Sequence, residues 1–385
     1  MKKSPLFTIF LVVFIDLLSF GIVIPILPYY SKSFGATAFQ LGWLMGIFSI
    51  MQFLFAPLWG MLSDKIGRRP VLLATILGGA CAMAAAALAG NYWLLFFARL
   101  LAGIFAANIS TATAYITDIT TSENRAKGMG IIGASFGLGF IFGPAIGGIL
   151  SVYGYAAPVL AASVLGLANF IFAYFVLDES RKSTSSKFRK RLSRENLLIA
   201  FAHKATSVPI SLFFINTLAF TQLEVIFGLY VLKKFGYDAK NAGLLLAGMG
   251  VIGATIQGGL IGKLSRRFGE ANLLPMGFAL LMIGMAGAAF ANSIPFFMLT
   301  LVAISIGNSL ENPSLSSLTS KGAPEEHRGL VMGIYQSGSS MARVIGPPAA
   351  GFLFDQVSDT SPILISSGFA AFALLLSLAY RKDLA

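Results

Sequence analysis

The chain has 385 residues, of which 56% are hydrophobic and 11% are charged, and its net charge at pH 7 is +12. A soluble domain carries about 25% charged residues, so this chain has too little polar surface to solvate its apolar side chains. These values exclude a soluble globule and predict a membrane protein. A spanning helix needs about 20 mostly apolar residues, so a dozen of them would leave only short loops and no room for a sizeable soluble domain.

Twelve apolar stretches follow one another along the chain, separated by polar segments. The first is too long for the core of a signal peptide, so we expect it to remain in place as the first span. The predicted spanning helices cover residues 7–30, 40–62, 71–90, 93–117, 128–151, 156–177, 207–232, 241–262, 272–291, 295–318, 329–353 and 361–380. The expected fold is an all-α integral membrane protein.

The positions of the basic residues predict the orientation of these spans. Of the 28 Lys and Arg residues, 22 fall in segments on one predicted side, four on the other and two within spans. Because cytoplasmic loops carry an excess of Lys and Arg, both termini are expected in the cytoplasm of a multi-pass protein of the inner, or plasma, membrane. The positive charge thus indicates topology and contact with the lipid bilayer. A nucleic-acid partner is not expected, since it would need basic residues clustered on a folded surface.

A basic linker at 178–205 is the only long polar connection, and it divides the chain into predicted six-helix bundles at 1–177 and 206–385. The two halves are related, because matching residues recur at a spacing of 201 to 204. This regular spacing indicates an internal duplication. The matching pairs include Gly35 and Gly236, Gly67 and Gly269, Gly103 and Gly307, Arg125 and Arg328, Gly143 and Gly346, and Pro144 and Pro347.

The loop between the second and third predicted spans, GMLSDKIGRR at 60–69, combines glycines, an acid and bases. Its glycines permit helices to approach closely, and its acid can pair with a helix N-terminus or a base in one state only. We therefore expect a cytoplasmic gate, asymmetric because Arg266 occupies the position of the acid in the second half; a loop that only sets topology is the alternative. Asp118 is a candidate partner for Arg68 or Arg69. The gate candidates are Gly60, Asp64, Gly67, Arg68, Arg69 and Asp118.

The fifth predicted span contains a run of small residues, GFIFGPAIGG at 139–148. Glycines spaced four residues apart lie on one helical face and allow another helix to pack closely, while the proline removes a backbone donor and bends the helix. Packing alone is the simpler interpretation of such a stripe. The residues of this motif are Gly139, Gly143, Pro144, Gly147 and Gly148.

These motifs resemble those of the major facilitator superfamily. The loop at 60–69 looks like its signature G-x-L-x-D-R-x-G-R-[KR], with Lys65 in place of the first arginine, and the run at 139–148 resembles a motif of its proton-coupled antiporters. The segments 16–28 and 99–103 are similar to twelve-span drug:proton antiporters, most like the tetracycline and multidrug efflux branch. The resemblance implies two pseudo-symmetric six-helix bundles that work by alternating access, a proton gradient as energy source, no cofactor, and a monomer.

Five charged residues fall within predicted spans, where a charge costs from about 3 kcal/mol upward and tends to be paired, cavity-facing and functional. A carboxylate that couples transport to protons must alternate between protonated and ionised forms; desolvation raises its proton affinity and a nearby arginine lowers it. We hypothesise that the acids Asp16 and Glu311, with Glu224 as a third candidate, bind protons or cationic substrate, and that Arg99 and Arg343 modulate them. Static ion pairs that only orient helices are the alternative.

Other polar residues in the spans are expected to line a cavity for substrate, and they are Gln52, Asn108, Gln222, Gln257, Asn312 and Gln336. The sequence lacks the phosphate-binding pattern G-x-x-x-x-G-K-[ST], so ATP is not expected as a partner. One cysteine and two widely separated histidines predict no metal site.

The sequence as a whole predicts a secondary transporter that exports a lipophilic small molecule in exchange for protons. The substrate is expected to be cationic or zwitterionic, as tetracycline-like or multidrug substrates are. A lipid or glycolipid flippase, or another small-metabolite exporter, would use the same fold and stays open as an alternative. A non-transporting receptor or a channel is the alternative from another class. Enzyme activity is not expected, because no nucleophile, base and orienting group stand together in a loop.

Overall fold

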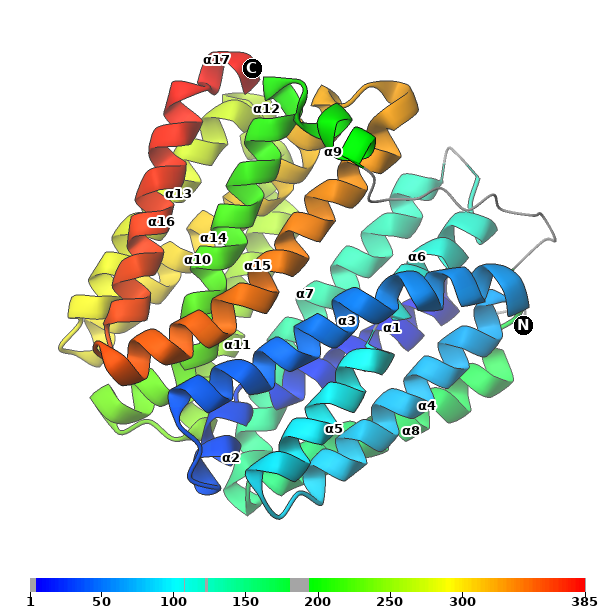
Figure 1. The fold of residues 1–385 in the computed structure, drawn as a ribbon, viewed down its shortest axis with the longest axis vertical. Helices are drawn as coiled ribbons and strands as arrows, with labels where there is room; N and C mark the ends of the chain where they lie inside the picture. Colours follow the sequence, from blue (N-terminus) through cyan, green and yellow to red (C-terminus); the bar gives the residue numbers. More distant parts are fainter. Residues whose placement is uncertain (1–4, 107, 122–123, 181–193, 385) are drawn as a thin grey trace. The chain divides into compact units, whose positions relative to one another are not determined.

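A computed structural model describes residues 5–106, 108–121, 124–180 and 194–384 (Figure 1). The regular elements within these residues are helices. Eleven helical segments of the described chain are long and apolar enough to cross a membrane, by length and composition. A further helix, α15 (Arg328–Gln356), has 29 residues and corresponds to the eleventh predicted span. The described chain is therefore an all-helical membrane protein whose long helices follow the predicted spans.

The first half of the chain contains α1 (Pro5–Val23), α2 (Leu27–Ser33), α3 (Ala38–Ile66), α4 (Arg68–Ala87), α5 (Tyr92–Phe105), α6 (Asn108–Ile119), α7 (Arg125–Leu150), the short η1 (Ser151–Tyr153) and α8 (Ala156–Val176). The second half contains α9 (Arg194–Phe201), α10 (Lys204–Phe235), α11 (Ala239–Thr255), the π-helical η2 (Ile256–Leu260), α12 (Ile261–Phe268), α13 (Glu270–Phe290), α14 (Ile294–Gly322), η3 (Glu325–His327), α15, α16 (Ser361–Ala379) and α17 (Arg381–Leu384).

The first predicted span forms two helices instead of one. α1 ends at Val23, and a turn that contains Pro25 precedes α2. Proline cannot donate the hydrogen bond that would continue α1, so the helix ends before it. Pro28 lies in the first turn of α2, where a missing N–H is tolerated. The expectation of one continuous helix over 7–30 is therefore wrong.

The fourth predicted span contains α5 and α6, and residue 107 between them lies outside the described residues. Two side chains of α3 donate hydrogen bonds to carbonyl groups at the end of α5. Gln52 Nε2 lies 3.1 Å from the carbonyl oxygen of Ala106, and Trp59 Nε1 lies 2.6 Å from that of Ile104. These hydrogen bonds join α3 to the end of α5.

Contacts within the chain separate two units. One comprises residues 1–187 with 231–250, and the other comprises residues 188–230 with 251–385. In the first unit α1 packs along α7 and α8, and α4 packs on α5 and α8. In the second unit α13 packs along α14 and α16. Each unit has its own core of buried apolar side chains from these helices.

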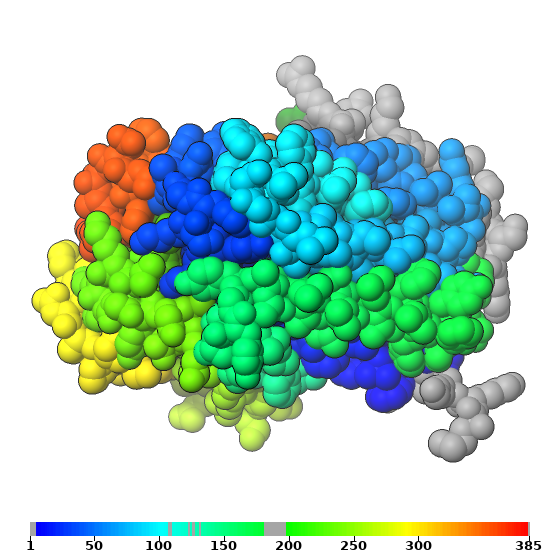
Figure 2. All heavy atoms as spheres, turned by 90° about the horizontal axis from the view of Figure 1, so that it is seen from below, coloured from blue at the N-terminus to red at the C-terminus, as the bar shows by residue number. Residues whose placement is uncertain are grey.

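The beginning of α11 packs with the helices of the first unit. A Cβ atom at Gly243 would lie 2.9 Å from the Cα of Gly148, near the end of α7. Figure 2 shows this light green segment beside the blue-green end of α7. The predicted domain boundary at 178–205 includes residues 181–193, which lie outside the described residues, so that boundary stays a prediction.

Hydrogen bonds that recur in the two units support the internal duplication. The hydroxyl of Tyr30 lies 3.1 Å from the carbonyl oxygen of Ala86, near the end of α4. In the second unit the hydroxyl of Tyr230 lies 2.7 Å from the carbonyl oxygen of Ala288, near the end of α13. The spacing is 200 residues between the tyrosines and 202 between the acceptors. A matching tertiary contact is therefore built at the same place in each half.

Turn glycines recur in the same way. Gly67 separates α3 from α4 with a φ of +110°, and Gly269 separates α12 from α13 with a φ of +77°. Side chains with a Cβ rarely adopt positive φ, which explains why glycine occupies both positions. Each glycine places a new helix start directly after the end of the preceding helix.

Candidate functional site

Glu311 lies in the interior of α14 and is completely buried. Neither of its carboxylate oxygens has a hydrogen-bond partner among the described residues. Its side chain lies against Gly277 of α13, where a Cβ atom would be 2.7 Å from Glu311 Cγ. Buried charges in proteins are normally paired, because an unpaired ionised group loses its hydration without compensation. Burial without a partner therefore distinguishes Glu311 as a candidate for binding a proton.

Glu224 and Arg343, the other charged residues of the second-half spans, form an ion pair. Arg343 Nη1 of α15 lies 3.5 Å from Glu224 Oε2 of α10. The side chain of Glu224 is 15% exposed and that of Arg343 is 46% exposed. The partly exposed Arg343 side chain is not enclosed by neighbouring residues. Glu224 is therefore a candidate for binding another cation in place of Arg343.

Arg99 of α5 is 4% exposed and has no ion pair among the described residues. Its guanidinium carbon instead lies 4.3 Å from the centre of the Phe48 ring in α3. A cation over an aromatic face is stabilised by about 0.5–2 kcal/mol. The Phe48 ring stacks on Phe20 of α1 with ring centres 5.4 Å apart. The sequence singles out Arg99 but not these rings, since phenylalanine occurs throughout the spans.

Asp16 is half-buried on α1, one helical turn before Phe20. It lies in the first unit with Arg99, whereas Glu224, Glu311 and Arg343 lie in the second. The candidate charges are thus divided between the two units.

The polar cavity candidates have different surroundings. Gln222 is buried and its Oε1 has no hydrogen-bond partner among the described residues, whereas Gln257, in η2, and Gln336 are exposed. Asn312 Nδ2 donates to Oδ1 of Asn308 at 2.9 Å. Gln52 donates to the end of α5, as described above. The side chain of Asn108 lies outside the described residues.

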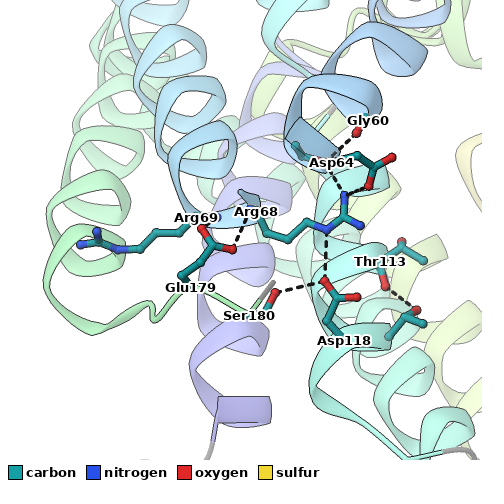
Figure 3. A network of polar contacts seen from close by, with 10 residues as sticks. Gly60, Asp64, Arg68, Arg69, Thr113, Asp118, Glu179 and Ser180 are labelled. Carbon is teal, nitrogen blue, oxygen red and sulfur yellow. Dashed lines mark hydrogen bonds and ion pairs between the residues drawn. The ribbon is translucent and has the colours of Figure 1, made fainter. Parts of the chain in front are cut away.

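The loop 60–69 forms a polar network around Arg68 (Figure 3). Arg68 Nη1 lies 2.6 Å from Asp64 Oδ1, and Arg68 Nε lies 3.1 Å from Asp118 Oδ2 in α6. The Nη1 group also donates to the hydroxyl of Ser63. Asp118 thus contacts Arg68, while Arg69 donates to the carbonyl oxygen of Tyr174 in α8 at 2.6 Å. The network joins three helix ends, those of α3, α4 and α6.

Two residues that follow α8 complete this network. Glu179 Oε1 accepts a hydrogen bond from the backbone N–H of Arg68 at 2.8 Å, and Oε2 accepts one from Arg69 N–H at 3.2 Å. The carboxylate therefore caps the N-terminus of α4, which carries a partial positive charge. Ser180 donates to Asp118 Oδ2 at 3.3 Å. Sequence reasoning missed both residues; the available signal was an acid directly after the sixth span.

A second network occupies the matching place in the second unit. Glu270 Oε2, at the start of α13, lies 2.7 Å from Lys321 Nζ near the end of α14. Glu270 Oε1 accepts a hydrogen bond from Ser317 at 2.8 Å. Arg266, at the position of the first-half acid, donates to the carbonyl oxygen of Gly262 in its own helix at 3.1 Å. Duplicated positions therefore hold charges of opposite sign.

The glycine run of α7 forms close helix contacts. A Cβ atom at Gly143 would lie 2.6 Å from the backbone of Gly21 in α1, and one at Gly139 would lie 3.0 Å from Leu17. Gly147 is similarly close to the backbone of Ile22. These three glycines face α1, whereas Gly148 faces α11, and Pro144 lies inside the helix. The run therefore lets α7 pack between two helices of the first unit.

A family model described as Major Facilitator Superfamily matches residues 9–324 and 260–384. The match covers nearly the whole chain, including the gate network and the intramembrane charges. The chain belongs to the major facilitator superfamily. It is therefore a multi-pass membrane transporter of small molecules, not an enzyme.

Curated relatives of this major facilitator chain include drug-resistance proteins. The class C tetracycline resistance protein of Escherichia coli is 32% identical over 353 residues, which cover 90% of this chain and 88% of the relative. The quinolone resistance protein NorA of Staphylococcus aureus is 28% identical over 381 residues, which cover 99% of this chain and 97% of the relative.

Solved structures of major facilitator transporters share the fold. The human organic anion transporter MFSD10 aligns with a TM-score of 0.73 at 24% identity, covering 98% of this chain and 99% of that one. A bacterial homologue of the human lysosomal transporter Spinster aligns with a TM-score of 0.81 at 14% identity, covering 98% and 96%. The fold is thus the expected all-α arrangement of two pseudo-symmetric six-helix bundles.

Proposed function

We propose that this transporter is a proton-coupled antiporter that exports lipophilic, cationic or zwitterionic drugs by alternating access. The observation that carries the proposal is Glu311, an acid buried within a span without a partner among the described residues. A transporter driven by protons needs a carboxylate whose proton affinity differs between the conformation open to one side of the membrane and the conformation open to the other. The drug-resistance names of the relatives support the choice of substrate class.

Glu311 takes up one proton on a carboxylate oxygen and changes from charge −1 to neutral. Release of this proton on the other side of the membrane restores the negative charge of Glu311. The neutral form suits the buried position in the structure, because none of the described residues supplies a donor or cation that would compensate an ionised form.

Glu224 serves as the cation-recognition acid in this proposal. Its ion pair with Arg343 is partly exposed, so a cationic drug can compete with the arginine for the carboxylate. Asp16 is the candidate acid of the first unit, and Arg99 is its modulator. The Phe48 ring holds the Arg99 guanidinium without neutralising it, so the positive charge remains available to an acid or an anionic group.

The remaining parts of the proposal concern location and energy source. The transporter lies in the inner, or plasma, membrane with both termini in the cytoplasm, as the excess of Lys and Arg on one predicted side supports. It acts as a monomer, uses the proton gradient, and needs neither ATP nor a cofactor.

The test uses inverted membrane vesicles that hold an acid interior, with ethidium and tetracycline as probes. Added probe should dissipate the proton gradient with the wild-type chain. Glu311→Gln should reduce this proton movement at least tenfold while ethidium binding is retained. Glu326→Gln, which removes a carboxylate with an 81% exposed side chain, is the matched control and should behave like the wild type.

Retained proton movement in Glu311→Gln would remove this acid from the coupling mechanism. If the wild-type chain moves neither probe but transfers a fluorescent lipid between leaflets, the flippase alternative replaces drug export. Probe-independent ion conductance would favour a channel.

A further inference from the structure

α13 and α14 approach each other closely along a line of glycines in the second unit. A Cβ atom at Gly307 of α14 would lie 2.7 Å from the carbonyl oxygen of Gly277 in α13. A Cβ atom at Gly284, two turns further along α13, would lie 2.7 Å from Ile304 Cγ1. Glycine removes the side-chain bulk that would otherwise keep the two backbones apart.

Glu311 is inserted into this helix contact. A Cβ atom on Gly277 would lie 2.7 Å from Glu311 Cγ and 3.2 Å from Oε1. The space that a side chain at position 277 would occupy is therefore taken by the acid. The hydroxyl of Ser314, one turn along, donates to the carbonyl oxygen of Leu310 at 2.7 Å and is not bonded to the carboxylate.

Neither carboxylate oxygen of Glu311 has a hydrogen-bond partner among the described residues, so no charged group holds the side chain in this position. α15, which also packs on α14, carries the bases Arg328 and Arg343, but these bind the Ser320 carbonyl oxygen and Glu224. Glu270 is the only charged residue of α13 and lies at its first position, where it binds Lys321. Residues 256–260 of η2 bring no charged side chain. Shape, not an ion pair, therefore defines where the Glu311 side chain lies.

We propose that Gly277 is a positioning residue that opens a slot for the proton-carrying side chain of Glu311. The inference rests on the proposed function of Glu311. In the slot the acid is neutral and shielded from water, so its proton cannot return to the side from which it came. The acid leaves the slot to release the proton and returns after it binds the next one. Gly277 thus serves the step at which the bound proton is isolated.

The test is a double-mutant cycle in the full-length transporter. Gly277→Ala places a methyl group 2.7 Å from Glu311 Cγ, and we expect at least a tenfold loss of ethidium-driven proton movement in vesicles. Glu311→Ala removes Cγ and with it this clash. The drop in the midpoint of thermal unfolding that Gly277→Ala causes should therefore be at least halved when Glu311→Ala is also present.

Gly284→Ala is the matched control in the same helix contact. Its Cβ would meet Ile304 Cγ1 at 2.7 Å and backbone atoms at 3.0 Å, distances similar to those at Gly277, but it does not touch Glu311. Glu311→Ala should not reduce the drop in unfolding midpoint that Gly284→Ala causes. Thermal unfolding in detergent reports the general packing cost of each alanine, so a loss of fold is separated from a loss of coupling.

Three results would overturn the proposed role of Gly277. They are normal coupling in Gly277→Ala, an equal drop in unfolding midpoint for Gly277→Ala with and without Glu311→Ala, or an equal relief when Glu311→Ala is added to Gly284→Ala. Failure of the proposed function has a different outcome, since Glu311→Gln would then keep proton movement whatever residue occupies position 277.

Discussion

The networks at the starts of α4 and α13 occupy matching positions but carry opposite charges. In the first unit the base Arg68 begins α4 and binds the acid Asp118 at the end of α6. In the second unit the acid Glu270 begins α13 and binds the base Lys321 at the end of α14. The duplicated halves have thus kept an ion pair between two helix ends while its polarity is reversed.

The helix dipole makes these two arrangements unequal. A helix N-terminus carries a partial positive charge and a C-terminus a partial negative charge, worth about 0.3–1 kcal/mol for a nearby side chain. Glu270 and Lys321 both have the favourable sign for their helix ends. Arg68 and Asp118 both have the unfavourable sign.

Glu179 compensates the first network by binding two N–H groups at the start of α4. The first network therefore depends on a residue from outside its own helices, which the second does not need. A network with this dependence is easier to open, and we expect the first to act as the gate and the second as a permanent tie.

The largest effect is expected for a substitution of Asp118, which breaks the ion pair of the first network. Asp118→Lys puts a second cation next to Arg68, and we expect at least a tenfold loss of ethidium transport in vesicles, because like charges replace an ion pair at 3.1 Å. Adding Asp64→Arg, Arg68→Glu and Glu179→Gln copies the polarity of the second network, where Arg266 occupies the position of Asp64, and should restore at least half of the wild-type rate. A folded quadruple variant without transport would show that the gate requires its own polarity.

Removing the cap of α4 should have a smaller effect. Glu179→Gln weakens two hydrogen bonds and removes a charge at a helix N-terminus, for which we expect a loss of about 1 kcal/mol in stability. The midpoint of thermal unfolding in detergent measures it. Within the quadruple variant above, glutamine at position 179 should be neutral or favourable compared with Glu179. An equal loss in both backgrounds would contradict the proposed compensation.

Arg99 differs from the bases of both networks, because the Phe48 ring holds it in place of an acid. Phe48→Leu removes the aromatic face, and we expect a threefold to tenfold loss of proton-coupled transport, in keeping with a cation–π contribution of about 1 kcal/mol. Phe48→Tyr keeps the face and should retain transport. Phe97→Leu, at a 59% exposed position, is the control. Equal rates in the leucine and tyrosine variants would show that the ring acts only through its volume.

The smallest effect is expected in the second network. The Lys321 side chain is 66% exposed, and exposed ion pairs are worth about 0.2–1 kcal/mol. Lys321→Met should therefore lower stability by about 0.5 kcal/mol or less and leave ethidium transport within twofold of the wild type. A loss comparable with that of Asp118→Lys would mean that both networks take part in gating.

Much of the architecture could be predicted from the order of residues along the chain. Apolar runs located the long helices, and spacings of 201 to 204 residues revealed the duplication. These features depend on local composition and on order along the chain. Helix ends and contacts between helices were harder to place: Pro25 ends α1 early, and Gln52 and Trp59 of α3 bind carbonyl groups at the end of α5.

The sequence by itself determined a membrane transporter of this superfamily and a short set of charged residues within its spans. Only the tertiary structure decided their partners: Arg343 for Glu224, the Phe48 ring for Arg99, and the slot at Gly277 for Glu311. The physical reason is that hydropathy sets which segments enter the membrane, whereas the rotation of each helix about its axis and its closest approach to neighbours set which side chains meet. Those quantities depend on packing between residues far apart in the chain.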